Sequence, residues 1–420
     1  VQVLNTNRVY VPNIDFHDVS KMDREMGDFL HSILMTNGGS PGITQQPPSS
    51  STGMMCSAKP TEVPALPHMV LSDSSKSMLS ARGLDPVANE RAIAKSLSHI
   101  DEWEWDIFQL DQLTGGLPLA ILSRGVFDRH RLFARLGLEQ DKWETYFNKI
   151  EASYRLANPY HNSRHAADVL QCINFFLTSG RLGIILTDIE TLSLVIAAIV
   201  HDVDHPGRNN VFEMSTRSEL AMIWNDHSVL ENHHCATAYS LLLKDPSLLS
   251  SLTSSQKKEL RETVINLVLA TDMAQHFDLH GKFKAKVHSM GGIDLKDHRD
   301  RVMIMVMALK CDDIRNPARI QTQCKRWGEL VTEEFFLQGD EEAKRGLPIS
   351  AFMDRSKQDV PKSQISFIEF IVGPLFQSFS EVLPEVNVCM KQLEINLKMW
   401  KDLQKSSSPS SSPMSTSLTP

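Results

Sequence analysis

Histidines are concentrated in one part of this 420-residue chain. Seven of the sixteen fall within residues 161–234, namely His161, His165, His201, His205, His227, His233 and His234. Neutral imidazole is the commonest metal ligand among side chains, and it also exchanges protons near neutral pH. The cluster therefore points to a metal site, to acid–base chemistry, or to both.

The first group of histidines lies in the segment Asn-Pro-Tyr-His-Asn-Ser-Arg-His-Ala-Ala-Asp at residues 158–168. Asn158 followed by Pro159 is typical of a helix start. His161 and His165 are four residues apart, so on a helix they would share one face. Two surface histidines without a function explain this spacing equally well when it is taken alone.

A second group follows the apolar run at residues 192–200. Charged groups packed at the end of a buried helix are costly unless they are paired or bind a metal. His201 and Asp202 offer one nitrogen and one oxygen, which suits Zn²⁺, and the carboxylate can bridge to Mg²⁺ or Mn²⁺. We expect Pro206 and Gly207 to end this helix. A capped helix end with a salt bridge is the competing interpretation.

A third group, Asp312 and Asp313, ends the apolar stretch at residues 303–309. Three helix ends would then meet in a mixed nitrogen and oxygen site with open positions, as catalytic metal sites have. We predict that this site collects His165, His201, Asp202 and one of the two aspartates. Glu231 and His205 would orient the ligands and the ion-bound waters.

The elements that must position these residues have the pattern of helices. Helical spacing of apolar residues dominates residues 88–404, whereas strand alternation between hairpin turns is scarce. The clearest helical stretches are 188–200, 260–270, 301–310 and 366–376. We therefore predict one all-α catalytic domain over residues 88–404.

The flanking segments differ from this domain in composition. We predict an N-terminal segment at 1–37 with one amphipathic helix over 19–35, and a linker rich in Ser, Pro and Gly at 38–87. Residues 405–420 form a Ser/Pro-rich tail that we expect to be disordered, because such composition buries too little apolar surface to fold. The chain begins with Val1 and not Met, so we expect a fragment of a longer protein.

Composition excludes several classes of protein. The net charge is −8, with 43 Lys and Arg against 51 Asp and Glu, which argues against a nucleic-acid partner. The six cysteines form no CxxC pair, so a secreted disulfide scaffold or a structural zinc ribbon is not expected. No apolar run approaches the roughly 20 residues of a membrane span. We expect a cytoplasmic protein whose membrane association, if any, resides in other regions, and we leave the oligomeric state open.

Six motifs occur in order along the chain and share one resemblance. They are Tyr-His-Asn-x-x-His-Ala-x-Asp at 160–168, His-Asp-Val-Asp-His-Pro-Gly at 201–207, Asn-Asp-x-Ser-Val-Leu-Glu-Asn-His-His at 225–234, Ala-Thr-Asp-Met at 270–273, Glu-Glu-Phe-Phe-x-Gln-Gly-Asp at 333–340 and Lys-Ser-Gln-Ile-Ser-Phe-Ile at 362–368. Together they resemble the class I 3′,5′-cyclic nucleotide phosphodiesterases, whose catalytic domain is an all-α metallophosphohydrolase of HD type. The resemblance spans about residues 100–404.

Within this class, the segments 104–110, 201–208 and 361–368 resemble the cAMP-selective family 8. The segments 231–232, 271–273 and 350–354 depart from that family, so we interpret the chain as a divergent member. Asp312 also departs, because the class usually has a small residue there. This extra carboxylate is harmless if it faces solvent, and it alters metal affinity if it faces the ligands.

The resemblance implies a two-metal centre. Zn²⁺ would take the tighter position, and Mg²⁺ or Mn²⁺ would be held mainly through waters. The implied ligands are His165, His201, Asp202 and Asp313, with Asp202 contacting both ions. The waters of the second ion would be bound by His205, Glu231 and Thr271.

The resemblance also implies an acid and a purine pocket. His161 would be the general acid, and we expect Glu231 to hold it in orientation. The implied substrate-binding residues are Tyr160, Asn316, Val331, Gln364 and Phe367. Gln364 would bind the purine edge, while Phe367 and Val331 would enclose the base.

The implied reaction is hydrolysis of a cyclic nucleotide to the 5′-nucleoside monophosphate. Two ions would lower the pKa of a bridging water and neutralise the phosphoryl oxygens, so that a metal-bridged hydroxide attacks while His161 protonates the leaving 3′ oxygen. The amide of Gln364 serves adenine or guanine, depending on its flip, and Asn316 favours cAMP. The alternatives are a cGMP or dual-specificity phosphodiesterase, another HD-type nucleotide phosphohydrolase, and an inactive nucleotide-binding protein.

Overall fold

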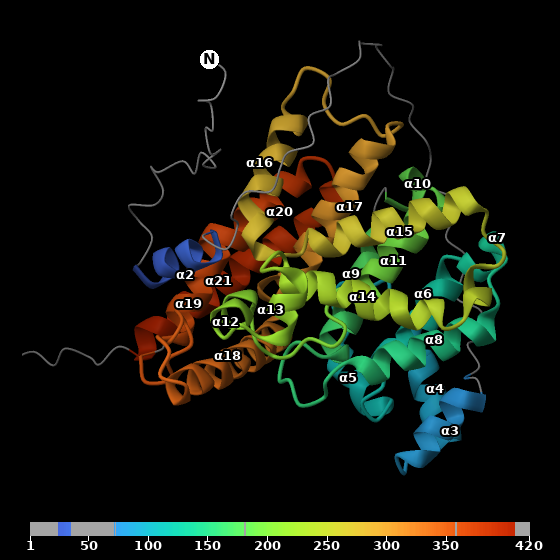
Figure 1. Cartoon of the computed structure of the whole chain (residues 1–420), viewed down its shortest axis with the longest axis horizontal. Helices are drawn as coiled ribbons and strands as arrows, with labels where there is room; N and C mark the ends of the chain where they lie inside the picture. Colours follow the sequence, from blue (N-terminus) through green and yellow to red (C-terminus); the bar gives the residue numbers. More distant parts are fainter. Residues whose placement is uncertain (1–23, 35–70, 72, 180–181, 358, 408–420) are drawn as a thin grey trace, which may run out of the picture.

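The computed structural model describes residues 24–34, 71, 73–179, 182–357 and 359–407 (Figure 1). Within these ranges the regular secondary structure is helical and contains no β-strand, which confirms the predicted all-α class. No helix among the described residues combines the length and the hydropathy that a membrane crossing requires.

The first half of the chain supplies short and medium helices. They are α2 (Arg24–Leu34), α3 (Asp73–Ala81), α4 (Pro86–Leu97), α5 (Ile107–Leu113), α6 (Pro118–Arg129), α7 (Leu132–Leu136), α8 (Gln140–Ser153), α9 (Ser163–Ser179), α10 (Leu182–Ile185), α11 (Asp188–Val200), α12 (Asn210–Ser215) and α13 (Glu219–Trp224).

The second half includes the longest helices and several short turns of 3₁₀ or π type. They are α14 (Val229–Leu243), η1 (Pro246–Leu249), α15 (Ser254–Leu269), η2 (Met273–Gln275), α16 (His276–Val287), α17 (His298–Asp313), η3 (Asn316–Ala318), α18 (Gln321–Lys344), α19 (Val360–Phe367), η4 (Ile368–Val372), α20 (Gly373–Ser380), η5 (Pro384–Val386) and α21 (Asn387–Ser407).

Helix α11 runs through the centre of the molecule, packed against α9, α15 and α17 (Figure 1). Its bounds agree with the helical stretch predicted at 188–200, whereas the expectation that Pro206 and Gly207 end this helix was wrong. The helix begins at a capping box, in which Thr187 Oγ1 accepts from the backbone N–H of Glu190 and Glu190 accepts from that of Thr187. Such a box satisfies two backbone donors that the first turn leaves unpaired. Every residue from Ile189 to Val200 is buried, so the C-terminal end of α11 delivers the next residues into the core.

The helix predicted to begin at Asn158 begins at Ser163 instead. The side chain of Asn162 occupies the capping position, where its Oδ1 accepts from the backbone N–H of Arg164 at 3.0 Å. The preceding residues form a turn that Asn158 closes, because its Nδ2 donates to the carbonyl of His161 at 2.9 Å. His161 therefore precedes the helix of His165 and does not share its face.

Two further helix ends differ from the prediction. Helix α11 ends at Val200, well before Pro206, because residues 201–204 turn and Asp204 takes a left-handed φ of 60°. The predicted helix at 366–376 is divided by the π turn η4. Pro374 lies in the first turn of α20 and has no N–H to donate, which is a common reason for an interrupted helix.

The linker predicted at 38–87 is wrong for its last part. Residues 73–81 form α3, whose Leu79 is fully buried and which packs against α4. Leu71 is buried as well, and its N–H donates to Glu90 on α4 at 2.8 Å. The Ser-rich composition suggested that the loss of chain entropy on folding would keep this segment disordered. Burial of these apolar side chains against α4 offsets that loss. Residues 38–70 and the tail from 408 lie outside the described residues.

Candidate metal centre

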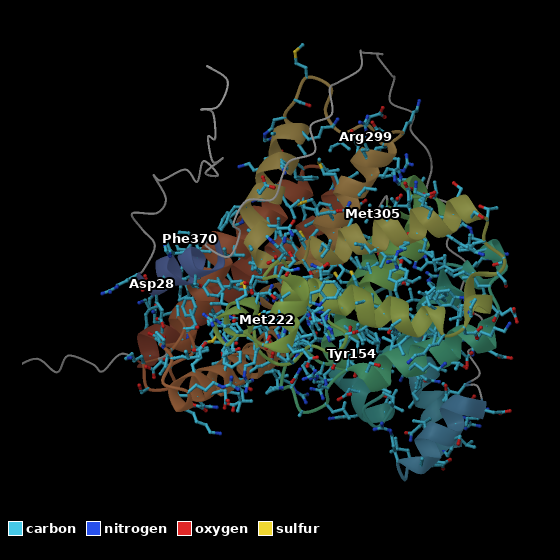
Figure 2. All side chains as sticks on the ribbon, viewed as in Figure 1. Asp28, Tyr154, Met222, Arg299, Met305 and Phe370 are labelled. Carbon is cyan, nitrogen blue, oxygen red and sulfur yellow. The ribbon has the colours of Figure 1, made fainter. Side chains whose placement is uncertain are left out.

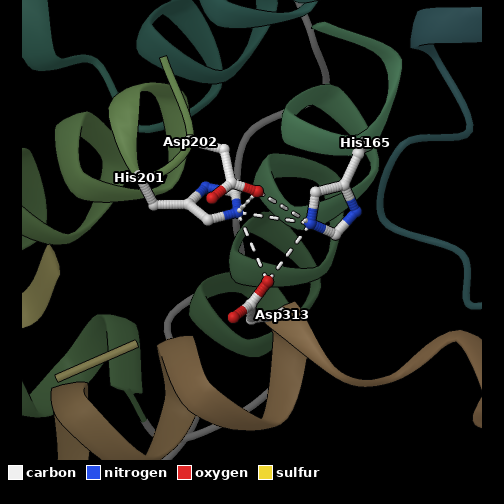
Figure 3. A group of neighbouring side chains, drawn as sticks. All are labelled: His165, His201, Asp202 and Asp313. Atoms are coloured by element: carbon white, nitrogen blue, oxygen red, sulfur yellow. Dashed lines mark hydrogen bonds and ion pairs between the residues drawn. The ribbon is translucent and has the colours of Figure 1, made fainter. Parts of the chain in front are cut away.

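The four predicted ligands meet at one point (Figure 3). His165 comes from the first turn of α9, His201 and Asp202 follow α11, and Asp313 ends α17. The Nε2 atoms of His165 and His201 lie 3.3 Å apart. Asp313 Oδ1 lies 3.2 Å from His165 Nε2 and 3.4 Å from His201 Nε2. Asp202 Oδ2 lies 3.5 Å and 3.3 Å from the same two nitrogens.

These distances fit a bound cation. Ligand atoms about 2.0–2.1 Å from a tetrahedral Zn²⁺ would stand about 3.3 Å from one another. Asp202 Oδ2 is buried and faces the Nε2 atoms of His165 and His201, as expected of an oxygen that shares an ion with them. His201 Nδ1 lies 3.0 Å from the carbonyl oxygen of Ala198 and donates to it, so Nε2 is the nitrogen that faces the other ligands and would bind a metal on losing its proton. The donor set therefore can hold a divalent metal ion.

The carboxylates of this cluster are held in their charged form. Burial alone would raise the pKa of Asp313, but hydrogen bonds from His165 and His201 lower it below the usual range. Burial opposes ionisation of Asp202 too, and the charge and hydrogen bond of His201 outweigh it, so that its pKa lies well below the ordinary value. Two negative oxygens at the bottom of a buried site create the need for positive charge that a divalent cation meets.

The other oxygen of Asp202 faces two more histidines. His234 Nε2 lies 3.7 Å from Asp202 Oδ1, and the ligand atoms of Asp202, His205 and His234 all lie within 4.8 Å of one another. His205 Nδ1 accepts from the backbone N–H of Gly207 at 3.0 Å, so the proton of this neutral ring is on Nε2. His205 can therefore donate to a water near Asp202. Sequence reasoning missed His234, because an adjacent pair of histidines gives no indication of which one faces inward.

His161 lies beside this centre and is held by a residue that the sequence analysis did not select. Its Nδ1 donates to Oε1 of Glu334 at 2.5 Å, and Oε2 of Glu334 accepts from the backbone N–H groups of Tyr160 and His161, both at 2.9 Å. Burial would lower the pKa of His161, but the charge and hydrogen bond of Glu334 outweigh it and raise the pKa to about 9. His161 is therefore protonated at neutral pH.

Three imidazoles stack next to the metal ligands. The ring of His205 lies between those of His161, at 4.1 Å between centroids, and His234, at 5.7 Å. Burial and the charge of His161 lower the pKa of His205 well below its usual range, and burial lowers that of His234 to about 4. One positive charge is thus confined to the His161 end of the stack.

Glu231 does not hold His161, contrary to the expectation. Its carboxylate accepts from the side-chain amide of Asn210 at 3.0 and 3.2 Å. Burial and the neighbouring charge of Asp272 raise the pKa of Glu231 to about 8. Thr271 is buried as well, and its hydroxyl donates to the carbonyl of Val268 at 2.7 Å. The predicted water-binding roles of Glu231 and Thr271 stay predictions.

The predicted substrate-binding residues lie on the turn before α9, on η3, on α18 and on α19. The Nδ2 group of Asn316 donates to the hydroxyl of Tyr160, whose ring lies 4.6 Å from that of His165. Gln364 on α19 faces Gly328 on α18, since a Cβ placed on Gly328 would lie 3.8 Å from Gln364 Cδ. Val331 follows Gly328 by three residues and Phe367 follows Gln364 by three, so each pair shares a helix face.

A buried ion cluster ties the substrate side of the site to the metal side. Asp168, three residues after His165 on α9, accepts from Arg319 at 2.6 Å and lies 3.0 Å from Arg315. Arg319 also donates to the carbonyl of Trp103 at 2.8 Å. Asn316 lies between the two arginines in sequence. The cluster therefore fixes the position of Asn316 relative to the helix that carries His165.

Asp312 does not face solvent. Its side chain is buried among Arg315 and Cys172, and burial raises its pKa to about 8. The neighbouring positive charge of Arg315 favours its ionised form, but burial outweighs that effect. No contact of Asp312 with the four ligands is found among the described residues, so its carboxyl group lies beside the ion cluster of Asp168 and not in the metal centre.

An all-α domain that gathers two histidines and two aspartates around one point, beside a histidine held by a carboxylate, defines a metallophosphohydrolase of the HD type. The family model of the 3′5′-cyclic nucleotide phosphodiesterases matches residues 160–393. The chain belongs to this family.

Curated relatives agree with this assignment. The chain is 35% identical over 360 residues to the human high affinity cAMP-specific and IBMX-insensitive 3′,5′-cyclic phosphodiesterase 8A, covering 80% of this chain and 43% of the relative. It is 36% identical over 319 residues to mouse 3′,5′-cyclic-AMP phosphodiesterase 4C, covering 74% of this chain and 46% of that protein. The chain thus spans less than half the length of these relatives. A family 8 enzyme is among them, as the motifs predicted.

Proposed function

We propose that this chain hydrolyses 3′,5′-cyclic AMP to 5′-AMP. The observation that carries the proposal is the position of His161, a protonated histidine beside a cluster of four metal ligands. We propose Zn²⁺ at the four-ligand position and Mg²⁺ or Mn²⁺ beside Asp202. When bound, two such ions lower the pKa of water and neutralise phosphoryl oxygens.

The residues around the ions supply the proton. The leaving 3′ oxygen of a cyclic phosphodiester is a poor leaving group until it is protonated. His161 donates from Nε2, because Glu334 accepts from Nδ1 and fixes the ring. Neutral His205 next to it does not compete for this role, and its Nε2–H is available to orient water.

The purine is proposed to bind between α18 and α19. Gln364 and Asn316 offer side-chain amides to its edge, and Phe367 and Val331 offer apolar surface to its two faces. Both curated relatives described above have cAMP in their names, which favours adenine over guanine. We also propose a cytoplasmic location. The five cysteines that the structure describes are free and buried, as a reducing compartment favours.

Turnover by the purified, metal-loaded chain tests this function. We expect loss of cAMP, slower loss of cGMP, and release of 5′-AMP without 3′-AMP when the products are separated by chromatography. Absence of turnover of either nucleotide, with two divalent ions per chain found by metal analysis, would falsify the proposal. If cGMP is hydrolysed faster than cAMP, the preferred substrate is cGMP, but the proposed reaction is still the hydrolysis of a cyclic nucleotide.

A further inference from the structure

Three buried polar side chains lie at four-residue spacing along α18. They are Glu334, Gln338 and Glu342, which are 3%, 2% and 3% exposed. Residues four apart share one face of a helix, so these side chains form a polar row on one side of α18. Glu334 holds the turn of His161. The two other members of the row hold two further segments of the site.

Gln338 binds the loop that follows the metal ligands at the end of α11. Its Oε1 accepts from the backbone N–H of Asn209 at 2.9 Å, and its Nε2 donates to Oδ1 of Asn209 at 3.0 Å. Oδ1 of Asn209 also caps α12, because it accepts from the backbone N–H of Phe212 at 2.9 Å. Gln338 thus fixes the start of α12 through both polar atoms of its amide.

The segment held by Gln338 carries or contacts two residues with proposed roles at the second ion. His205 stands four residues before Asn209, and its ring accepts from the N–H of Gly207 within the same loop. Asn210, the first residue of α12, donates its side-chain amide to Glu231 at 3.0 and 3.2 Å. A shift in the start of α12 would therefore move both His205 and Glu231.

Glu342 determines which way the amide of Gln338 points. A carboxylate only accepts hydrogen bonds, and Oε1 of Glu342 faces Nε2 of Gln338 at 2.9 Å. The amide nitrogen therefore donates to Glu342, which leaves Oε1 of Gln338 for the N–H of Asn209. Both hydrogens and the oxygen of this amide are in use, as expected of a buried polar group that specifies one geometry.

Glu342 also binds the loop at residues 346–353, which follows α18. It accepts from the backbone N–H and from the hydroxyl of Ser350, both at 2.7 Å. Met353 lies so close to α18 that a Cβ on Gly339 would stand 1.9 Å from its carbonyl oxygen, so only glycine fits beside Gln338. The loop is therefore attached to α18 on both sides of residue 352.

This loop leads to the proposed stacking residue of the purine. Phe352 belongs to a small apolar cluster, and Phe367 and Phe370 pack against that cluster. Figure 2 labels Phe370, which lies in the π turn η4 directly after α19. The polar row of α18 is thus connected to the second-ion side of the site through Asn209 and to the purine side through the loop of Phe352.

We propose that Gln338 and Glu342 are positioning residues, which keep the loop of His205 and the loop of Phe352 in a fixed relation to each other. The proposal rests on the proposed function. Gln338 acts on the second ion through Asn209. Glu342 acts on the second ion through Gln338 and on the purine side through Ser350.

Kinetics and the binding of Mn²⁺ to the full chain test these roles. Gln338→Met keeps the length of the side chain and removes its hydrogen bonds to Asn209 and Glu342. We expect kcat, and the affinity for Mn²⁺ measured by electron paramagnetic resonance, each to fall roughly tenfold, the usual cost of losing such a supporting contact. KM for cAMP should stay close to the wild-type value. Ser350→Ala should instead raise KM and leave kcat and the Mn²⁺ affinity as they are.

Gln323→Met is the matched control on the same helix. Gln323 is also buried, and its Nε2 donates to the carbonyl of Trp105 at 3.1 Å and not to a segment of the site. This variant should lose stability in denaturant unfolding, because it too removes a buried hydrogen bond, but it should keep the wild-type kcat, KM and Mn²⁺ affinity.

The double variant tests whether Glu342 acts through Gln338. Glu342→Gln keeps the shape of the side chain and places an amide nitrogen against a donor, so part of the loss seen in Gln338→Met should reappear. The two changes together should cost no more kcat or Mn²⁺ affinity than Gln338→Met alone, because the residues act in one chain of contacts. Additive losses would contradict this order of action.

The binding measurements separate this proposal from the proposed function. If the chain binds Mn²⁺ with the expected pattern across the variants but does not turn over cAMP, the proposed function fails and the positioning roles stand. Equal Mn²⁺ affinity and equal kcat in Gln338→Met and Gln323→Met would overturn the proposal. If Gln338→Met does not fold, Glu342→Gln decides, and wild-type kcat and Mn²⁺ affinity in that variant would overturn it as well.

Discussion

Nδ1 of His161 lies 2.5 Å from Oε1 of Glu334, a residue 173 positions further along the chain. This contact settles which end of the imidazole is free. Glu334 also receives the backbone N–H groups of Tyr160 and His161, so it holds both the side chain and the turn that carries it. The orientation of the proposed acid is therefore provided from α18, a helix that supplies none of the four metal ligands.

Replacement of the proposed acid should separate turnover from metal binding. In His161→Gln we expect kcat to fall about 10²- to 10⁴-fold, the usual contribution of a positioned acid, while the metal content is unchanged. Asp202→Ala should lose both metal and activity, because it removes the carboxylate whose two oxygens face the two proposed ion positions. Kinetics and metal analysis on the same samples make the comparison. If both variants bind the full amount of metal and are equally active, the roles assigned to His161 and Asp202 are wrong.

The pH dependence of turnover should report the contact with Glu334. The pKa of His161 is about 9, above its ordinary value near 6.5, so the wild-type rate should hold up to pH 8 and fall as the pH passes about 9. In Glu334→Gln, burial still lowers the pKa of His161, but the charge that raises it is gone. The alkaline limb of the pH–rate profile should therefore move to lower pH. If the alkaline limb of the pH–rate profile is unchanged in Glu334→Gln, a group other than His161 is responsible for that limb.

The contribution of the His161–Glu334 contact to the stability of the fold should decrease as the pH rises. A raised pKa means that the His161–Glu334 interaction contributes fully below about pH 6.5 and is lost as pH rises through about 9. Glu334 has its pKa lowered to about 2, against burial, so its contribution is lost only at strongly acidic pH. Thermal unfolding of Glu334→Gln against the wild type at pH 6 and pH 9.5 should show a smaller difference at pH 9.5.

The buried ion cluster should matter more for stability than a surface pair does. Asp168→Asn leaves Arg315 and Arg319 without their shared carboxylate, and breaking such a buried pair costs about 3–5 kcal/mol. The control Glu333→Gln breaks a half-exposed pair with Arg355, for which we expect at most about 1 kcal/mol. Denaturant unfolding measures both. If the two variants lose similar free energies of unfolding, the buried ion cluster stabilises the fold no more than a surface ion pair does.

Gly328 offers a test of the purine pocket with its own control. A Cβ there would lie 3.5 Å from Trp400 and 3.8 Å from Gln364, an ordinary contact, so Gly328→Ala should keep its KM and gain about 1 kcal/mol of helix stability. Gly328→Leu extends into the space beside Gln364 and should raise KM for cAMP about tenfold or more. An unchanged KM in Gly328→Leu would place the base elsewhere.

Part of this architecture was predictable from local sequence, and α11 shows why. Its boundaries depend on a capping box and a continuous apolar run, both of which are visible within 14 residues. His201 and Asp202 were predictable for a related reason, because they stand where charged residues follow an apolar helix. The spacing of His161 and His165, and the choice between Asp312 and Asp313, left alternatives open that only the family resemblance resolved. The early start assigned to α9 was wrong, because Asn162 competes with Asn158 as the cap and only the packed turn decides between them.

Other features depend on contacts between distant residues. Glu334 is one of two adjacent glutamates on α18, and nothing local distinguishes the buried residue from its exposed neighbour Glu333. His234 and His233 present the same difficulty on α14. Helix α3 was assigned to a linker because its burial depends on α4 and not on its own Ser-rich composition. In each case the deciding interaction joins parts of the chain that no sequence window contains together.

The ligands of the metal centre are also far apart along the chain, with His165 and Asp313 separated by 148 residues. Closing so long a loop costs entropy that only packing of the intervening helices repays, and folding slows as such distant contacts dominate. We therefore expect the ion-binding geometry to form only when the intervening helices have packed. A divalent metal should then load onto an already folded domain, and a cell short of that ion would accumulate folded, empty molecules that later uptake of the ion could activate.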